Sequence, residues 1–117
     1  AVDLVVIEKQ MTRRMCQIQY ALEALLVARG DVAVLQVAPR SVKMHFDMLG
    51  RGNHAANKRR AIAKLKSMLA PAGIAQLAAL FPRKQDDVAD AVLQALFAAA
   101  KAPVLLQRQS RCCGRVG

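Results

Sequence analysis

The stretch "VDLVVIE", residues Val2–Glu8, decides the fold class. A short run of β-branched apolar residues is typical of a strand that is buried on both faces of a sheet. Apolar residues then recur at helical spacing, so we predict a helix over Met11–Arg29, ended by Gly30. The following stretch, "DVAVLQVAP", predicts a second strand that stops at Pro39. Alternation of strand, helix and strand predicts an α/β fold.

The remainder of the chain predicts helices. A loop is expected over Arg40–Gly52, a helix from Asn53 to the Pro71 region, and a short apolar helix over Ile74–Phe81. A last helix follows, with Asp86 as a natural N-cap. The expected inner faces of the helix after Asn53 and of the last helix carry Ile62, Leu65, Leu69, Val88, Val92, Leu96 and Ala99. We expect one domain over residues 1–102 and a basic, mobile tail over 103–117.

The composition indicates a protein that binds a polyanion. Eighteen Lys and Arg against eight Asp and Glu give a net charge of +10, for which nucleic acid is the usual partner. Aromatic residues make up only 3%, which argues against base stacking on single strands and favours backbone contacts with a duplex.

Cysteine usage and hydropathy set the expected compartment. Three cysteines without a CxxC spacing indicate neither a disulfide framework nor a zinc site, which fits an intracellular, reducing compartment. We find no apolar run of the ~18 residues that span a membrane, and no basic region of a signal peptide at the start. We therefore expect a soluble protein that is not exported and has no membrane partner.

Three of the eight acidic residues, Asp86, Asp87 and Asp90, are crowded into one short segment. Asp87 and Asp90 are three residues apart at the start of the predicted last helix, so they share a face. Acids favour helix N-termini, where the macrodipole stabilises each by roughly 0.3–1 kcal/mol, and this alone is one explanation. Crowding three acids adds repulsion, however, which a divalent cation would remove.

Glu8 ends the first strand. A charge at a strand end often marks only the point where the chain meets solvent, but the C-terminal strand ends of an open α/β sheet are also where sites are built. We expect Glu8 to face Asp87 and Asp90. Oxygen ligands suit Mg²⁺ or Mn²⁺, and two such ions ~4 Å apart can stabilise both the attacking and the leaving oxygen of a phosphodiester. A carboxylate cluster on a basic protein predicts a nuclease.

Several motifs resemble a known family. "VVIEKQ" (Val5–Gln10) resembles the second catalytic block of RuvC-type Holliday junction resolvases, in particular their poxvirus and large DNA virus branch. "DDVADAVLQAL" (Asp86–Leu96) resembles the C-terminal block, in which an Asp-x-x-Asp pair on a helix completes the metal site. "VAPRSVKMHF" (residues 37–46) and "NKRRAIAKL" (residues 57–65) are also similar to the viral pattern.

The resemblance implies a ribonuclease H-like fold, with a mixed central sheet flanked by helices. It also implies a homodimer that nicks four-way DNA junctions symmetrically with Mg²⁺, in the viral factory or host cytoplasm. Its metal ligands would be Glu8, Asp87 and Asp90, with Asp86 as a neighbour. The family begins with a strand that carries a further catalytic Asp, and Asp3 lies at the wrong end of the Glu8 strand to replace it. We therefore expect an N-terminal portion to be missing.

Two basic runs flank the predicted acidic site. Because exposed lysines and arginines contact phosphates, we expect DNA contacts from both runs, although a charge run is often only a solvated helix face. The candidates are Lys9, Arg13, Arg14, Lys43, Lys58, Arg59, Arg60 and Lys64, with Arg51 and Lys66 in the same second run.

Two other functions stay open from the sequence. One is a non-catalytic basic module that binds DNA or RNA, in which Asp87 and Asp90 are only helix-start acids. The other is a different ribonuclease H-like nuclease, of the transposase type or acting on RNA. Metal binding separates the first from a resolvase, and the preferred substrate separates the second.

Overall fold

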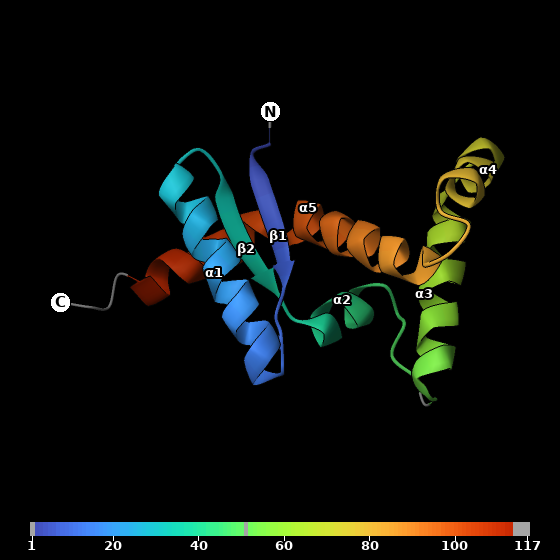
Figure 1. Cartoon of the computed structure of the whole chain (residues 1–117), viewed down its shortest axis with the longest axis horizontal. Helices are drawn as coiled ribbons and strands as arrows, with labels where there is room; N and C mark the ends of the chain where they lie inside the picture. The colour runs from blue at the N-terminus through green and yellow to red at the C-terminus, as the bar shows by residue number, and fades with distance from the viewer. Residues whose placement is uncertain (1, 51, 114–117) are drawn as a thin grey trace. The chain divides into compact units, whose positions relative to one another are not determined.

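The structure, a computed structural model, describes residues 2–50 and 52–113. It divides into two compact units, one formed by residues 1–39 and 97–117 and the other by residues 40–96. The last helix, α5 (Gln85–Cys113), contributes to both units (Figure 1). Each unit is described in turn.

The first unit is built on a strand, a helix and a parallel strand. β1 (Leu4–Glu8) pairs with β2 (Ala33–Val37), and the pairing runs from Leu4 with Ala33 to Glu8 with Val37. Between them lies α1 (Arg13–Arg29), as a crossover between parallel strands requires. The α/β class predicted from the sequence is therefore confirmed, although the sheet has only two strands in the described residues.

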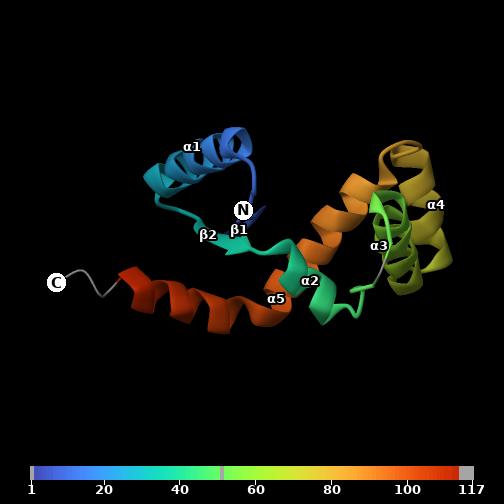
Figure 2. The same ribbon diagram turned by 90° about the horizontal axis from the view of Figure 1, so that it is seen from below.

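Local signals define the ends of α1. The Thr12 hydroxyl accepts a hydrogen bond from the amide of Met15, which caps the first turn. Gly30 ends the helix with φ at 75°, a left-handed conformation that glycine adopts at little cost. Figures 1 and 2 show α1 on one face of the sheet and the C-terminal part of α5 on the other. The buried residues of this unit are Gln19, Leu35, Val37, Phe97 and Ala98.

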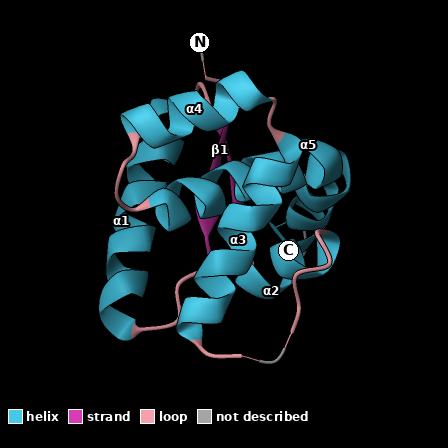
Figure 3. Ribbon diagram, turned by 90° about the vertical axis from the view of Figure 1, so that its right-hand side faces the viewer, coloured by secondary structure: helices cyan, strands magenta, loops and turns pink. Residues whose placement is uncertain are grey.

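The second unit is helical. It contains α2 (Pro39–His45) from Arg40 onwards, α3 (His54–Met68), α4 (Pro71–Leu80) and the first part of α5. All of these elements are helices, drawn in cyan in Figure 3, and both strands belong by their residue ranges to the first unit. Asn53 caps α3 by accepting from the amide of Ala56 at 3.0 Å. The buried core of the second unit consists of Val42, Ala61, Leu65, Leu77, Ala89 and Leu93.

Two helix boundaries differ from the sequence prediction. The predicted loop over Arg40–Gly52 is wrong at its start, because Pro39 opens α2 and Val42 buries itself as the anchor of this short helix. Pro71 likewise begins α4 instead of ending the previous helix, so α4 starts before the predicted Ile74. Proline fits the first turn of a helix because the missing amide hydrogen would have no partner there.

The last helix also differs. It starts at Gln85, so Asp86 lies inside the first turn and is not the N-cap. The buried stripe contains Ala89, Leu93 and Phe97, one position beyond the predicted Val88, Val92 and Leu96. The stripe that includes the large Phe97 ring has more apolar surface to bury. The helix continues through residues 103–113, where we expected a mobile tail, and residues 114–117 lie outside the described residues.

One segment of α5 is long and apolar enough to cross a membrane by length and composition alone. It covers Gln85–Arg108, with a mean hydropathy of 1.5 over its best window. The sequence analysis did not identify this segment because Asp86, Asp87, Asp90 and Lys101 interrupt its apolar residues. Core helices pass the same test, and α5 supplies Ala89, Leu93, Phe97 and Ala98 to the buried residues, so this is weak evidence for a membrane.

Candidate active site

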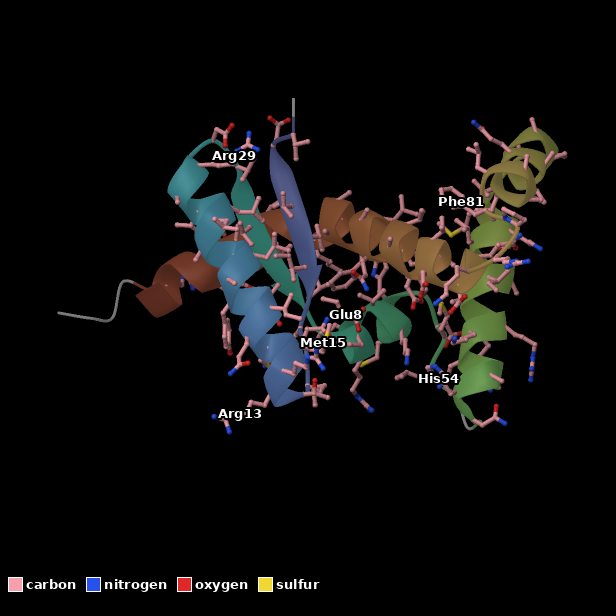
Figure 4. The ribbon with its side chains drawn as sticks, viewed as in Figure 1. Glu8, Arg13, Met15, Arg29, His54 and Phe81 are labelled. Atoms are coloured by element: carbon pink, nitrogen blue, oxygen red, sulfur yellow. The ribbon has the colours of Figure 1, made fainter. Side chains whose placement is uncertain are left out.

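Glu8 is the last residue of β1 (Figure 4). It is half-buried and stands opposite Val37, at the C-terminal ends of both parallel strands. The ladder continues one residue further, since the amide of Lys9 donates to the carbonyl of Val37 at 2.8 Å. The strand end that carries Glu8 is therefore fixed by β2, as expected for a site built at this edge of a sheet.

The three aspartates lie in the first turns of α5. Asp87 and Asp90 are exposed, whereas Asp86 is half-buried. The Nζ of Lys58, on α3, lies 3.1 Å from Oδ2 of Asp86, and the Nζ of Lys84 lies 3.8 Å from Oδ2 of Asp87. The hydrogen bond from Lys58 holds the pKa of the Asp86 carboxyl below its usual value.

These lysines change the interpretation of the acidic cluster. The sequence analysis inferred a divalent cation from repulsion among Asp86, Asp87 and Asp90. Lys58 and Lys84 already offset part of that repulsion with protein charge. What still suits a metal ion is the pair formed by Asp87 and Asp90, two exposed carboxylates that a spacing of three residues puts on one helix face.

The predicted metal ligands belong to different units of the structure. Glu8 belongs to the first unit, whereas Asp86, Asp87 and Asp90 belong to the second. Within neither unit do three described His, Cys, Asp or Glu side chains gather closely enough to hold a metal ion. The site that combines Glu8 with Asp87 and Asp90 stays a prediction.

The first basic run lies directly after Glu8. Lys9 precedes α1, and Arg13 and Arg14 form its first turn. All three side chains are exposed, and Figure 4 shows Arg13 extending away from the start of the helix. Their positions suit contact with phosphates near the end of β1.

Two members of the second basic run are engaged by the protein itself. Besides the pair of Lys58 with Asp86, Arg60 donates to the side chain of Asn57 at 3.0 Å. The guanidinium of Arg60 also fits against Gly50, where an added Cβ would lie 3.0 Å from Arg60 Cζ. Of the other candidates, Arg59 and Lys66 are exposed, Lys43 and Lys64 are half-buried, and Arg51 lies outside the described residues. DNA contacts by this run stay a prediction.

A polar network that was not predicted from the sequence lies on the inner side of α1. Gln19 is buried, and its Nε2 donates to Oε1 of Glu23, which also accepts from Nε2 of Gln36 on β2. The spacing of four residues between Gln19 and Glu23 was the available signal. It is easily overlooked, because glutamine and glutamate one turn apart are common on solvated helix faces.

The apolar residues of α1 lie on the outside. Met15, Ile18, Leu22 and Leu25 of α1 are all exposed, and so is Met11, which precedes the helix. The sequence analysis used their periodicity to predict the helix, which is confirmed from Arg13 onwards. Their exposure shows that the same periodicity does not mark the face that packs on the sheet.

Comparison with known proteins identifies a family. Residues 1–102 match the model of a family described as Poxvirus A22 protein. No curated protein and no solved structure matches the chain. The matched range contains Glu8, the aspartates of α5 and both basic runs.

Proposed function

We propose that this chain, which belongs to the poxvirus A22 protein family, cuts four-way DNA junctions by metal-dependent phosphodiester hydrolysis. The family is that of the Holliday junction resolvases, which implies a viral nuclease that binds branched DNA and acts in DNA recombination. The match over residues 1–102 is the observation that carries the proposal. The parallel βαβ unit supports a ribonuclease H-like fold.

We assign the metal site to Glu8, Asp87 and Asp90, with Asp86 as a neighbour. Carboxylate oxygens are the ligand atoms that Mg²⁺ and Mn²⁺ prefer, so these residues are suited to bind either cation. When bound, one or two such cations supply positive charge that stabilises the oxygens of the reacting phosphodiester. Lys58 pairs with Asp86 in the first turn of α5, and the exposed side chains of Asp87 and Asp90 are the ligands on this helix in the proposal.

The chain's basic residues bind and orient the DNA in this proposal. Arg13 and Arg14, exposed at the start of α1, hold phosphates beside Glu8. Arg59 and Lys66 on α3 contact the backbone of a junction arm. Backbone contacts carry little sequence information, so binding depends mainly on the shape of the junction.

A homodimer completes the proposal, with α1 as its interface. Met15, Ile18, Leu22 and Leu25 of α1 are exposed and recur at alternating spacings of three and four, which is the spacing of one helix packed along another. An interface between identical copies must be complementary to itself, and an apolar helix stripe meets that condition. Two copies also place one site on each of two DNA strands, as symmetric nicking requires. We name Met15, Ile18, Leu22 and Leu25 the α1 stripe.

The test replaces each proposed ligand with its amide in the complete protein. Asp87→Asn, Asp90→Asn and Glu8→Gln should lower junction nicking in Mg²⁺ by roughly a thousandfold or more, because the metal contributes several kcal/mol and each 1.36 kcal/mol is tenfold in rate. Junction binding in chelator should hold or rise slightly, since a charge that repels phosphates is removed. Asp3→Asn, an exposed aspartate at the other end of β1, is the matched control.

The outcomes separate the candidate functions. Nicking that persists at the parental rate in chelator would rule out the metal mechanism. Tight binding of junctions by a parent protein that neither binds Mn²⁺ nor cuts would favour a non-catalytic DNA-binding module. Faster cutting of RNA–DNA hybrids or flaps than of four-way junctions would favour a different nuclease of the same fold.

A further inference from the structure

The backbone that follows Glu8 is tied to the inner face of α1. The amide of Gln10 donates to Oε1 of Gln19 at 2.9 Å, and the Sγ of Cys16 lies 3.2 Å from the carbonyl of Gln10, to which it donates. The side chain of Gln10 turns back and donates to the carbonyl of Glu8 at 3.0 Å. Residues 8–10 are thus held by two side chains of α1 and by a bond of their own.

The bond from Gln19 continues into a chain of side-chain hydrogen bonds. Nε2 of Gln19 donates to Oε1 of Glu23 at 2.8 Å. The same oxygen accepts from Nε2 of Gln36, on β2, at 2.7 Å. Gln19 therefore uses both ends of its amide, one on the segment after Glu8 and one on a carboxylate that is anchored to the sheet.

The composition of this face is unusual for a helix that packs on a sheet. Gln19 is 5% exposed and is the one buried polar side chain among the described residues. The α1 stripe, which offers far more apolar surface, is exposed. Burying an amide costs free energy unless its hydrogen bonds are made, so packing alone would favour an apolar residue at this position. If the amide of Gln19 holds the backbone next to Glu8 in place, this role explains why α1 buries Gln19 and leaves the α1 stripe exposed.

Sheet geometry indicates that α1 acts on Glu8 through the backbone. Gln36 points to the α1 side of the sheet, because it bonds Glu23. Its register partner Ile7 points to the same side, and Glu8, the next residue, points to the opposite one. The bonds from Gln10 to Gln19 and from Cys16 to Gln10 connect α1 to the backbone next to Glu8.

We propose that Gln19, held by Glu23, is a positioning residue for the Glu8 carboxylate. This inference rests on the proposed function, in which Glu8 binds the catalytic metal. A ligand carboxylate binds tightly only if its backbone is held in place, and loss of a supporting hydrogen bond around a metal ligand typically costs 10–100-fold in metal affinity or activity. Gln19 supports Glu8 indirectly: it accepts from the amide of Gln10, and the side chain of Gln10 donates to the carbonyl of Glu8.

The first test is Gln19→Met in the complete protein, a change that keeps the length of the side chain and removes both hydrogen bonds. We expect the Mn²⁺ dissociation constant, measured by calorimetry without DNA, to rise about 10–100-fold. The turnover number for junction nicking should fall with it, whereas junction affinity in chelator should stay at the parental value. Gln17→Met, the same substitution on the exposed side of α1, should change none of these quantities.

A second variant keeps the proposal testable if Gln19→Met does not fold. In the double variant Gln19→Glu with Glu23→Gln, the new carboxylate accepts from the Gln10 amide and from the new amide, which in turn accepts from Gln36. Because Oε1 of Glu23 serves both bonds in the parent protein, the new amide must turn so that its nitrogen faces position 19 and its oxygen faces Gln36. The bond between positions 19 and 23 then runs in the opposite direction, and the other two bonds keep their direction. We expect this variant to bind Mn²⁺ and to nick junctions close to parental values, whereas Gln19→Glu alone places two carboxyl groups one turn apart and should bind Mn²⁺ more weakly.

The outcomes are distinct. Parental Mn²⁺ affinity in a folded Gln19→Met protein would overturn the proposal, as would an exchanged double variant that folds with parental stability but has lost Mn²⁺ binding. A lowered melting temperature with unchanged Mn²⁺ affinity would show that the network is only structural. If the parent protein itself binds no Mn²⁺, the proposed function fails, and the positioning role fails with it for that separate reason.

Discussion

The α1 stripe leads to a quantitative prediction about the homodimer. Leu25 lies near the C-terminal end of the stripe and is 69% exposed. Fully burying a leucine side chain contributes about 1.5–3 kcal/mol, so covering the exposed part of Leu25 in both protomers should contribute about 2–4 kcal/mol. Leu25→Lys removes this contribution and adds a charge that must stay in water.

The expected change in dimer affinity follows directly. Because each 1.4 kcal/mol is a factor of ten, Leu25→Lys should raise the dimer dissociation constant by about 30- to 1,000-fold. The folded structure of one protomer should not suffer, since Leu25 makes no part of its buried core. Gln17→Lys introduces the same charge on an exposed position of α1 outside the stripe and should leave the dimer intact.

Sedimentation velocity over a concentration series measures the dissociation constant of each variant. Circular dichroism checks that the helix content is unchanged. A parent protein that is monomeric at every concentration, or a Leu25→Lys dimer as tight as the parent, would refute the assignment of α1 as the interface. Equal weakening by Gln17→Lys would show that added charge, and not the lost apolar contact, is responsible.

Two further predictions follow from the charges. Arg13→Gln with Arg14→Gln should make the slope of log junction affinity against log salt shallower by up to about two units, measured by fluorescence anisotropy. Lys58→Gln should change that slope by less, because its ammonium is engaged by Asp86. The lowered pKa of Asp86 means that its carboxylate stabilises the fold above its ordinary pKa of 3.8, and that this contribution is lost as the pH falls through the lowered value. The melting temperature of Lys58→Met should therefore lie below that of the parent by an amount that is full near neutral pH and shrinks as the pH falls below 3.8; a constant difference would contradict the ion pair.

The parts of the fold that were predicted correctly have local causes. β1 and β2 are short apolar runs, and the C-terminal end of α1 and the start of α3 are set by single residues next to them. Gly30 takes the left-handed conformation that its position predicted, and Asn53 caps α3 with its own side chain. Signals of this kind act within a few residues, so they can be identified in the sequence alone.

The parts that were not predicted depend on distant partners. α2 is too short for a periodic pattern, and it forms because Val42 finds a buried position in the second unit. The inner face of α1 is set by Gln36 on β2 and by the backbone of Gln10, neither of which the helix sequence reveals. An apolar stripe on a helix can pack either in the core or in an interface with a second protein chain. Periodicity therefore predicts a helix without indicating which side faces the sheet.

The acidic cluster shows how a distant partner can change a chemical inference. Repulsion among neighbouring carboxylates argues for a cation only if no other positive charge reaches them, and Lys58 reaches Asp86 from another helix. The case for a metal ion therefore no longer rests on crowding. It rests on family membership and on Asp87 and Asp90, which face solvent on one side of α5. Asp86→Asn should accordingly weaken the contact with α3 more than it weakens metal binding, whereas Asp90→Asn should do the reverse.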